Sequence, residues 1–502
     1  MSSDPTGSQP GGPVQGGGAA AGWRFCFDKP AQFHYQTRSM HRALRSLAAA
    51  GMVLLAGGCA HAPVNVPLGQ RDAAHGYSFH AHQRPNNLED LLLVLTFSGG
   101  GTRAAALACG VLEELGRTRF AVAGAPRRLL DEVDVISSVS GGSVTAAAYG
   151  LYGERAFTNL AASFLKRDVQ GALLSRTLNP LNWCRLGSGT FGRSDLAAEY
   201  YDKILFRGAT FGDLDRQPGP FLIINATDVS TGARFDFTQS QFDLIGSDLR
   251  SYRVSRAVAA SSAVPAVLTP VTLRNYGGDR GVPPDWLADV ARQTNRLSER
   301  VLLHVAEVRG YLDSLNRPYL HLVDGGVADN LGLRVVLDAL SLLEVVPALA
   351  PRYRLDRVTK VAVICVNAHS APEKDWDRKP SPPGMVNLAV ASAIIPIDRY
   401  SAETLALLKE KAEHWRQLTS QSRRRAAAGP EAPLSAVQFY PVVVGFAGLS
   451  DRQERHYFME QPTSFRLPAT AVDRLREVGG RLLRQSPEYQ QLLRDLGVGA
   501  GR

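Results

Sequence analysis

Mostly apolar runs alternate with helical patterns along most of the chain, and this alternation constrains the fold more than any other feature. The clearest runs have the length of strands and lie at residues 91–97, 133–139, 221–228, 319–324, 358–368 and 439–446. Strands that are apolar throughout are typical of parallel sheets with both faces covered. We therefore predict an α/β fold in which a mostly parallel central sheet is flanked by helices on both faces.

A segment at residues 276–318 interrupts this alternation. Its apolar residues keep a helical spacing over most of the segment. We predict a helical insertion, which is either a surface helix packed on the core or a cap over a binding site.

The N-terminal region has the layout of a secretory signal. Residues 40–59 begin with basic residues, continue with an apolar run too short to span a bilayer, and end in small residues before Cys59. The sequence Leu-Ala-Gly-Gly-Cys resembles the lipobox of bacterial lipoproteins, although a plain signal peptide is an alternative. The resemblance implies that Cys59 is lipidated and anchors the protein to a membrane of the bacterial cell envelope. Because Ala60 is not an aspartate, it implies the outer membrane rather than the inner one.

These features divide the chain into four parts. Residues 1–39 are rich in glycine and proline and precede the signal, so we interpret them as a disordered upstream segment that can reflect a wrongly assigned start. The signal at residues 40–59 is followed by a polar tether at residues 60–88. Residues 89–500 then form one α/β domain that contains the insertion.

Charge and cysteine usage limit the partners of this domain. The net charge of +9 comes from arginines spread along the chain, and we interpret the one short run, Arg423 to Arg425, as a solvated loop. We therefore predict no nucleic-acid partner. Downstream of Cys59 the chain contains Cys109, Cys184 and Cys365, which do not have the spacing of metal ligands. We predict no metal site and no cofactor.

The first predicted strand ends in three consecutive glycines, Gly99, Gly100 and Gly101, at the start of a predicted helix over residues 102–115. The corner also fits the dinucleotide fingerprint G-x-G-x-x-A, but that site needs an acidic residue at the end of the next strand. The next strand ends in serines instead, which argues against nucleotide binding. Glycine amides at a helix N-terminus can stabilise an oxyanion, and that use needs no acidic residue.

The second predicted strand ends in a serine elbow, Ser-Val-Ser-Gly-Gly, with Ser140 at its centre. A serine in such a strand-to-helix turn projects its Oγ into a site, as in G-x-S-x-G elbows. Ser138 replaces the first glycine of that pattern. Ser137, Ser138 and Ser143 are weaker candidates for a nucleophile because none of them is centred in the turn.

A third corner follows the strand at residues 319–324, where Asp324 precedes two glycines. The three corners in this order resemble the patatin-like phospholipase family of lipid acyl hydrolases, and the stretch at residues 261–271 is similar too. The resemblance implies the fold of that family, no cofactor, and a phospholipid or other acyl ester as substrate. It implies these roles: nucleophile Ser140, base Asp324, and an oxyanion loop of Gly99, Gly100, Gly101 and Arg103.

Three alternatives remain open. Arg103 either braces the glycine loop or makes a surface ion pair. His369 would complete a Ser-Asp-His triad in the chain order of α/β-hydrolases, whereas the family resemblance implies a Ser-Asp dyad. The function that we predict is a serine acyl hydrolase of the phospholipase A or lysophospholipase type. The alternative is a catalytically silent lipid-binding envelope protein that keeps the fold.

Overall fold

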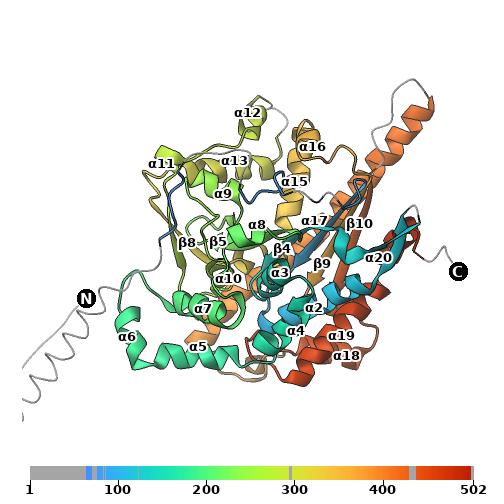
Figure 1. Ribbon diagram of the computed structural model, residues 1–502. Coiled ribbons are helices and arrows are strands. Elements are labelled where there is room, and N and C mark those ends of the chain that lie inside the picture. The colour runs from blue at the N-terminus through green and yellow to red at the C-terminus, as the bar shows by residue number, and fades with distance from the viewer. Residues whose placement is uncertain are drawn as a thin grey trace, which may run out of the picture. The chain divides into compact units, whose positions relative to one another are not determined.

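A mixed sheet of eight strands forms the centre of the computed structural model (Figure 1), which describes residues 64–69, 76–82, 84, 86–122, 124–292, 297–428 and 437–498. Its strand order is β10-β9-β1-β4-β5-β8-β7, with β6 paired to β5. The strands β10, β9, β1, β4 and β5 are mutually parallel, whereas β8 is antiparallel to both β5 and β7. The sheet strands are β1 Leu91–Phe97, β4 Val133–Val139, β5 Phe221–Asp228, β6 Arg234–Asp236, β7 Val271–Arg274, β8 Tyr319–Asp324, β9 Lys360–Asn367 and β10 Gln438–Gly445. A separate hairpin consists of β2 Arg119–Val122 and β3 Ala125–Arg128.

The connections place helices on both faces of this sheet. Parallel crossovers are right-handed, and the step from β1 to β4 runs in the opposite direction along the sheet to the step from β9 to β10. The helices in these two crossovers therefore lie on opposite faces. One face carries α2 and α3, with α19 packed on α2, and the other carries α17 with α14 and α15. The predicted fold class is confirmed.

The helices vary from one turn to more than ten turns. They are α2 Gly101–Arg117, α3 Gly141–Tyr152, α4 Arg155–Leu160, α5 Val169–Leu178, α6 Pro180–Leu186, α7 Arg193–Tyr201, α8 Phe211–Asp215, α9 Gln239–Leu244, α10 Val254–Ser261, α11 Gly277–Arg280, α12 Trp286–Ala291, α13 Glu299–Leu312, α14 Gly326–Asp329, α15 Arg334–Val345, α16 Leu349–Arg352, α17 Met385–Ala428, α18 Arg452–Met459, α19 Ala469–Gln485 and α20 Pro487–Asp495. The short 3-10 helices are η1 Leu129–Glu132, η5 Asp375–Arg378 and η6 Phe446–Gly448, and two π-helical turns are η2 Ala161–Leu165 and η3 Asp202–Phe206. Among the described helices, none is both long and apolar enough to cross a membrane.

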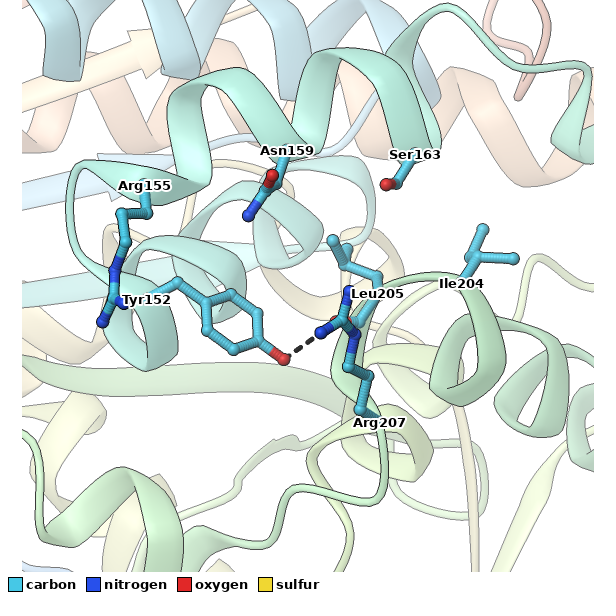
Figure 2. A pocket seen from close by; sticks show the side chains of 7 residues that line it. All are labelled: Tyr152, Arg155, Asn159, Ser163, Ile204, Leu205 and Arg207. Atoms are coloured by element: carbon cyan, nitrogen blue, oxygen red, sulfur yellow. Dashed lines mark hydrogen bonds between the residues drawn. The ribbon is translucent and has the colours of Figure 1, made fainter.

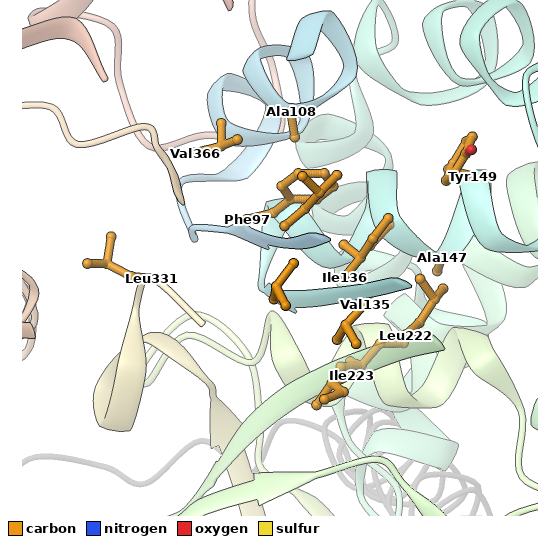
Figure 3. Packing of buried hydrophobic residues seen from close by; sticks show 14 of the residues in the cluster. Phe97, Ala108, Val135, Ile136, Ala147, Tyr149, Leu222, Ile223, Leu331 and Val366 are labelled. Atoms are coloured by element: carbon orange, nitrogen blue, oxygen red, sulfur yellow. The ribbon is translucent and has the colours of Figure 1, made fainter. Parts of the chain in front are cut away.

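The core forms where the apolar strands meet the helices. Figure 3 shows Phe97, Ile136 and Leu222 from three neighbouring strands, all of them fully buried. Cys109 and Cys365 are buried in the same core as free thiols, as small apolar side chains would be. This packing fixes the ends of β1, β4 and β5 relative to one another, and the functional residues follow those ends.

Two sequence-based predictions need correction. Part of the predicted tether is folded onto the domain, because Tyr77 is buried and its hydroxyl accepts a hydrogen bond from the Leu222 amide at 2.6 Å. The aromatic rings of Phe211 and Phe221 surround Tyr77, and this burial outweighs the polar composition of the segment. The arginine run, predicted as a loop, belongs to the long helix α17. Arginine and the three alanines that follow the run favour helix, which explains the difference.

Candidate active site

Ser140 occupies a strained turn between β4 and α3. Its φ of 50° and ψ of −120° lie in a region that side-chain-bearing residues rarely adopt. The turn is also close-packed, because a Cβ on Gly141 would lie 2.0 Å from the Gly101 carbonyl oxygen. Only glycine fits there, and the serine elbow therefore lies directly against the glycine loop.

Ser261 holds this elbow in place. The Ser140 amide donates to the Ser261 Oγ at 2.8 Å, and that hydroxyl donates to the Asn225 carbonyl at 2.6 Å. The segment that follows Ser261 also contacts Asp324, because the Asp324 amide donates to the Ala263 carbonyl at 3.0 Å. Sequence reasoning assigned no role to Ser261; its only signal was the similarity of the stretch at residues 261–271 to the family.

Asp324 ends β8, two strands away from the elbow. Its backbone pairs with Ala226 of β5, and its Oδ1 accepts a hydrogen bond from the Gly326 amide at 2.8 Å. The Ser140 side chain lies close enough to this carboxylate to lower its pKa. The structure thus brings together the two residues that were predicted to be catalytic.

Burial raises the pKa of the Asp324 carboxyl group. Asp324 is 6% exposed, and desolvation raises its pKa to about 6, although the Gly326 and Ser140 hydrogen bonds lower the pKa in part. Tyr201 of α7 lies close enough for the Asp324 charge to raise the pKa of its phenol, beyond the larger effect of burial. The carboxylate can therefore accept a proton at neutral pH more readily than an exposed aspartate.

The glycine loop presents its amides next to Ser140. The Gly99 amide is already engaged, because it donates to the Asn330 carbonyl at 2.9 Å, and the Thr102 amide donates to the Ser464 carbonyl at 2.9 Å. Within the described part of the chain, the amides of Gly100 and Gly101 have no acceptor. Of the three glycine amides in the predicted oxyanion loop, those of Gly100 and Gly101 are therefore available in this structure, and that of Gly99 is not.

Arg103 braces this loop from within the protein. Its guanidinium donates to the Ala368 carbonyl at 2.8 Å, the Gln461 carbonyl at 2.6 Å and the Thr463 Oγ1 at 3.0 Å. The side chain is buried, and desolvation lowers its pKa to about 10 while the charge of Asp398 opposes that shift. The alternative of a surface ion pair is wrong. Arg103 instead ties the loop to the segment before α19.

His369 does not pair with Asp324. It follows β9, which is separated from β8 by β1, β4 and β5. Its Nδ1 lies 3.2 Å from an Asp398 carboxylate oxygen of α17. The carboxylate partner of this histidine is therefore Asp398 and not Asp324.

Two further features lie outside this cluster. Asp228 is buried, pairs with Arg317 and accepts a hydrogen bond from the Ser230 amide at 3.1 Å, as a turn-forming aspartate does. In the insertion, α13 packs against α9, α11 and α15. Those contacts are typical of a surface helix. Cys59 lies outside the described residues.

A separate surface cavity of about 300 Å³ lies between α4, η2 and η3 (Figure 2). The side chains of Arg155, Asn159 and Arg207 line it, and Tyr152 donates a hydrogen bond to the Leu205 carbonyl at its edge. Neither Ser140 nor Asp324 lines this cavity. Its polar side chains are therefore not part of the serine–aspartate pair.

The part of the chain that contains this site matches a known protein family. Residues 95–337 match the family described as patatin-like phospholipase, and this range includes the glycine loop, Ser140 and Asp324. The chain contains a patatin-like phospholipase domain. His369 and the long helix α17 lie beyond the matched residues of this patatin-like domain.

Solved structures give a more distant similarity. The chain is similar to human GIVD cytosolic phospholipase A2, with 12% identity and a TM-score of 0.40 over 82% of this chain and 62% of that one. It is also similar to the same human protein in complex with methyl gamma-linolenyl fluorophosphonate, with 13% identity and a TM-score of 0.38 over 82% and 59% of the two chains. The chain thus covers less than two thirds of either human chain. None of the curated proteins matches the sequence.

The glycine loop of the patatin-like domain gives a first prediction. Gly100 has a φ of 136°, and a Cβ there would lie 2.9 Å from Arg103 Nη2. Gly100→Val should therefore displace the amides, and we expect kcat for ester hydrolysis to fall by on the order of 100-fold, as for loss of one oxyanion donor. Steady-state kinetics measure this effect.

The matched control is Gly124→Val, in the hairpin of β2 and β3. Gly124 also has a positive φ, of 82°, but a Cβ there would meet nothing within 4 Å. This variant reports the backbone strain alone. If both variants lose stability and activity to the same extent, the glycine loop is only structural.

Proposed function

We propose that the protein is a serine acyl hydrolase of the phospholipase A or lysophospholipase type, which cleaves fatty acyl esters of membrane lipids. The observation that carries this proposal is the position of the strained Ser140 beside the buried Asp324. A nucleophile in contact with a base of raised pKa is the arrangement that acyl transfer needs. The family match supports the lipid substrate.

The mechanism follows from the positions of the two side chains. Asp324 accepts the hydroxyl proton of Ser140 while the Oγ attacks the ester carbonyl. The tetrahedral intermediate collapses to an acyl-enzyme, and the protonated Asp324 gives its proton to the departing alcohol. A water molecule then attacks the acyl group and gives its proton to Asp324. Collapse of this second intermediate releases the fatty acid, and Ser140 regains its proton.

The oxyanion of each tetrahedral intermediate needs hydrogen-bond donors beside Ser140. The free amides of Gly100 and Gly101 support this role, with Arg103 bracing their loop through three hydrogen bonds. The Gly141 amide adds a donor at the N-terminus of α3, directly after the nucleophile. Sequence reasoning did not assign this third donor.

Aromatic side chains next to the carboxylate favour an acyl substrate. Tyr201 packs edge-on against Phe164 and Phe465, with ring centroids 5.8 Å and 6.3 Å away. The Tyr201 hydroxyl is buried, and among the described residues it has no hydrogen-bond partner. Tyr201 and Phe164 are fully buried, whereas Phe465 is only partly buried and keeps surface on which an acyl chain can pack.

The alternative function is a silent lipid-binding protein. The test is to incubate the full-length chain with a short-chain acyl ester and, separately, with phospholipid vesicles, and to measure released fatty acid. Covalent labelling by a fluorophosphonate probe reports the nucleophile independently. Lipid binding without hydrolysis or labelling would favour the silent protein.

We further propose that Cys59 carries a lipid anchor and that the protein resides at the outer membrane of a bacterial envelope. The support is the signal layout and the lipobox-like sequence before Cys59. Cys59→Ala should move the protein from the membrane fraction to the soluble one or leave it unprocessed. Mass spectrometry of the mature N-terminus checks this, and a terminus at any other residue contradicts the proposal.

A further inference from the structure

The hairpin of α5 and α6 exposes large apolar side chains. Of α5 only Val169 is buried, and none of the seven residues of α6 is buried. Leu181 is 82% exposed at the tip, and the exposed set on the two helices is Leu174, Leu178, Leu181 and Trp183. Figure 1 shows the two helices along the lower edge of the protein, with α6 at its corner. The hairpin therefore contributes little to the core, and its apolar side chains face outward.

The charges around this hairpin are suited to an anionic surface. Between Asp168 and Asp195 the charged side chains are Arg176, Arg185 and Arg193, and there is no carboxylate. Arg185 pairs with Glu199 of α7, in an ion pair that is largely exposed to solvent. Arg176 lies 4.5 Å above the Tyr200 ring, which leaves its charge available to a phosphate group. Exposed leucine and tryptophan side chains with arginines nearby are typical of interfacial membrane binding.

Short-range contacts connect the hairpin to the proposed active site. The Val169 amide at the start of α5 donates to the Phe465 carbonyl at 3.2 Å. The neighbouring Ser464 donates to the Gln170 side chain at 2.7 Å and accepts from the Thr102 amide at 2.9 Å. The start of α5 is thus connected through Ser464 to the glycine loop, and through Phe465 to the ring of Tyr201.

We propose that the α5–α6 hairpin docks the protein on an anionic lipid bilayer, with Leu181 at its tip inserted and the arginines against the lipid phosphates. This inference rests on the proposed function, because docking there presents acyl esters to Ser140. A second copy of the chain is a less suitable occupant, since a symmetric contact would bring together Arg176 and Arg193 from both copies.

The test uses the full-length chain with Cys59→Ala and Ser140→Ala, so that neither a lipid anchor nor hydrolysis affects binding. Co-sedimentation is measured with vesicles of equimolar phosphatidylcholine and phosphatidylglycerol, and with pure phosphatidylcholine. We expect binding to the anionic vesicles that weakens with salt. Leu181→Asp should reduce the partition coefficient at least tenfold, because it replaces an inserted apolar side chain with a charge.

The matched control is Leu315→Asp, the same substitution at a site that is 92% exposed and follows α13 on another part of the surface. It should bind as the parent does. Equal binding of all three proteins, or no binding by the parent, overturns the proposal. So does loss of binding in Met385→Asp but not in Leu181→Asp, which would place docking on α17. A dimer that Leu181→Asp dissociates, without any change in vesicle binding, would assign the hairpin to self-association.

The proposed hydrolase function and the proposed membrane docking can be tested independently. In the Ser140-containing protein, Leu181→Asp should lose hydrolysis of vesicle phospholipid by a similar factor and keep hydrolysis of a short water-soluble ester. Absence of ester hydrolysis in the parent contradicts the proposed function, whatever the vesicles show. Circular dichroism confirms that each variant is folded.

Discussion

Replacing Ser140 with alanine is expected to lower kcat for ester hydrolysis by on the order of 10⁴-fold or more, because the acyl-enzyme can no longer form. Labelling by a fluorophosphonate probe should vanish in the same variant. The protein should stay folded, since alanine keeps the backbone amide that donates to Ser261. Single-turnover kinetics and mass spectrometry of the labelled protein measure the two effects.

The matched control is Ser138→Ala, two residues earlier on the same strand. Ser138 is fully buried, and its hydroxyl donates to the Ile223 carbonyl at 3.3 Å, away from Asp324. This variant should keep its activity within a few-fold of the parent and keep its label. Labelling that persists in Ser140→Ala would show that another serine is the nucleophile.

The sequence is sufficient to locate the strands that carry the site. The runs at residues 133–139 and 221–228 coincide with β4 and β5, because strands buried on both faces are mostly apolar. The short strands β6 and β7 were not predicted. Each has at most four residues, too few for a periodic pattern. The direction of β8, antiparallel to β5, is a tertiary property that no local pattern records.

The residues of the site also divide into those that the sequence predicts and those that it does not. Ser140 and Asp324 could be predicted because each follows an apolar strand in a glycine-rich corner. The supports of the site could not, because their contacts join distant parts of the chain. Arg103 bonds to the Gln461 carbonyl across 358 positions, and Ser261 bonds to the Ser140 amide across 121 positions. Single-sequence reasoning detects local chemistry, whereas positioning residues are defined by packing.

Asp324→Asn is expected to lower kcat by on the order of 10³- to 10⁴-fold, because the amide cannot accept the Ser140 proton. In the parent protein, kcat/KM should rise with pH as Asp324 ionises, and it should be half-maximal near pH 6. The asparagine variant should lack this titration. Initial rates from pH 4 to pH 9 measure both effects.

The same variant should be at least as stable as the parent above pH 6. Folding raises the Asp324 pKa, so the folded state retains its proton between the unfolded value of 3.8 and about 6. The ionised carboxylate therefore costs stability, and this cost develops as the pH rises through that window, to about 3 kcal/mol above it. Chemical denaturation at pH 4 and pH 8 should show this loss in the parent and a smaller loss in Asp324→Asn. An equal loss in both would mean that burial does not disfavour the charge.

His369→Asn is the control that separates a dyad from a triad. Histidine is the better base in water at neutral pH, so chemistry alone would favour a triad. The structure instead places His369 after β9, with Asp398 as its carboxylate partner, and three strands lie between β9 and the strand that bears Asp324. We expect His369→Asn to keep its activity within a few-fold of the parent. A large loss of activity in a folded His369→Asn protein would make the histidine the base and reduce Asp324 to its support, because a triad that lacks its base retains little turnover.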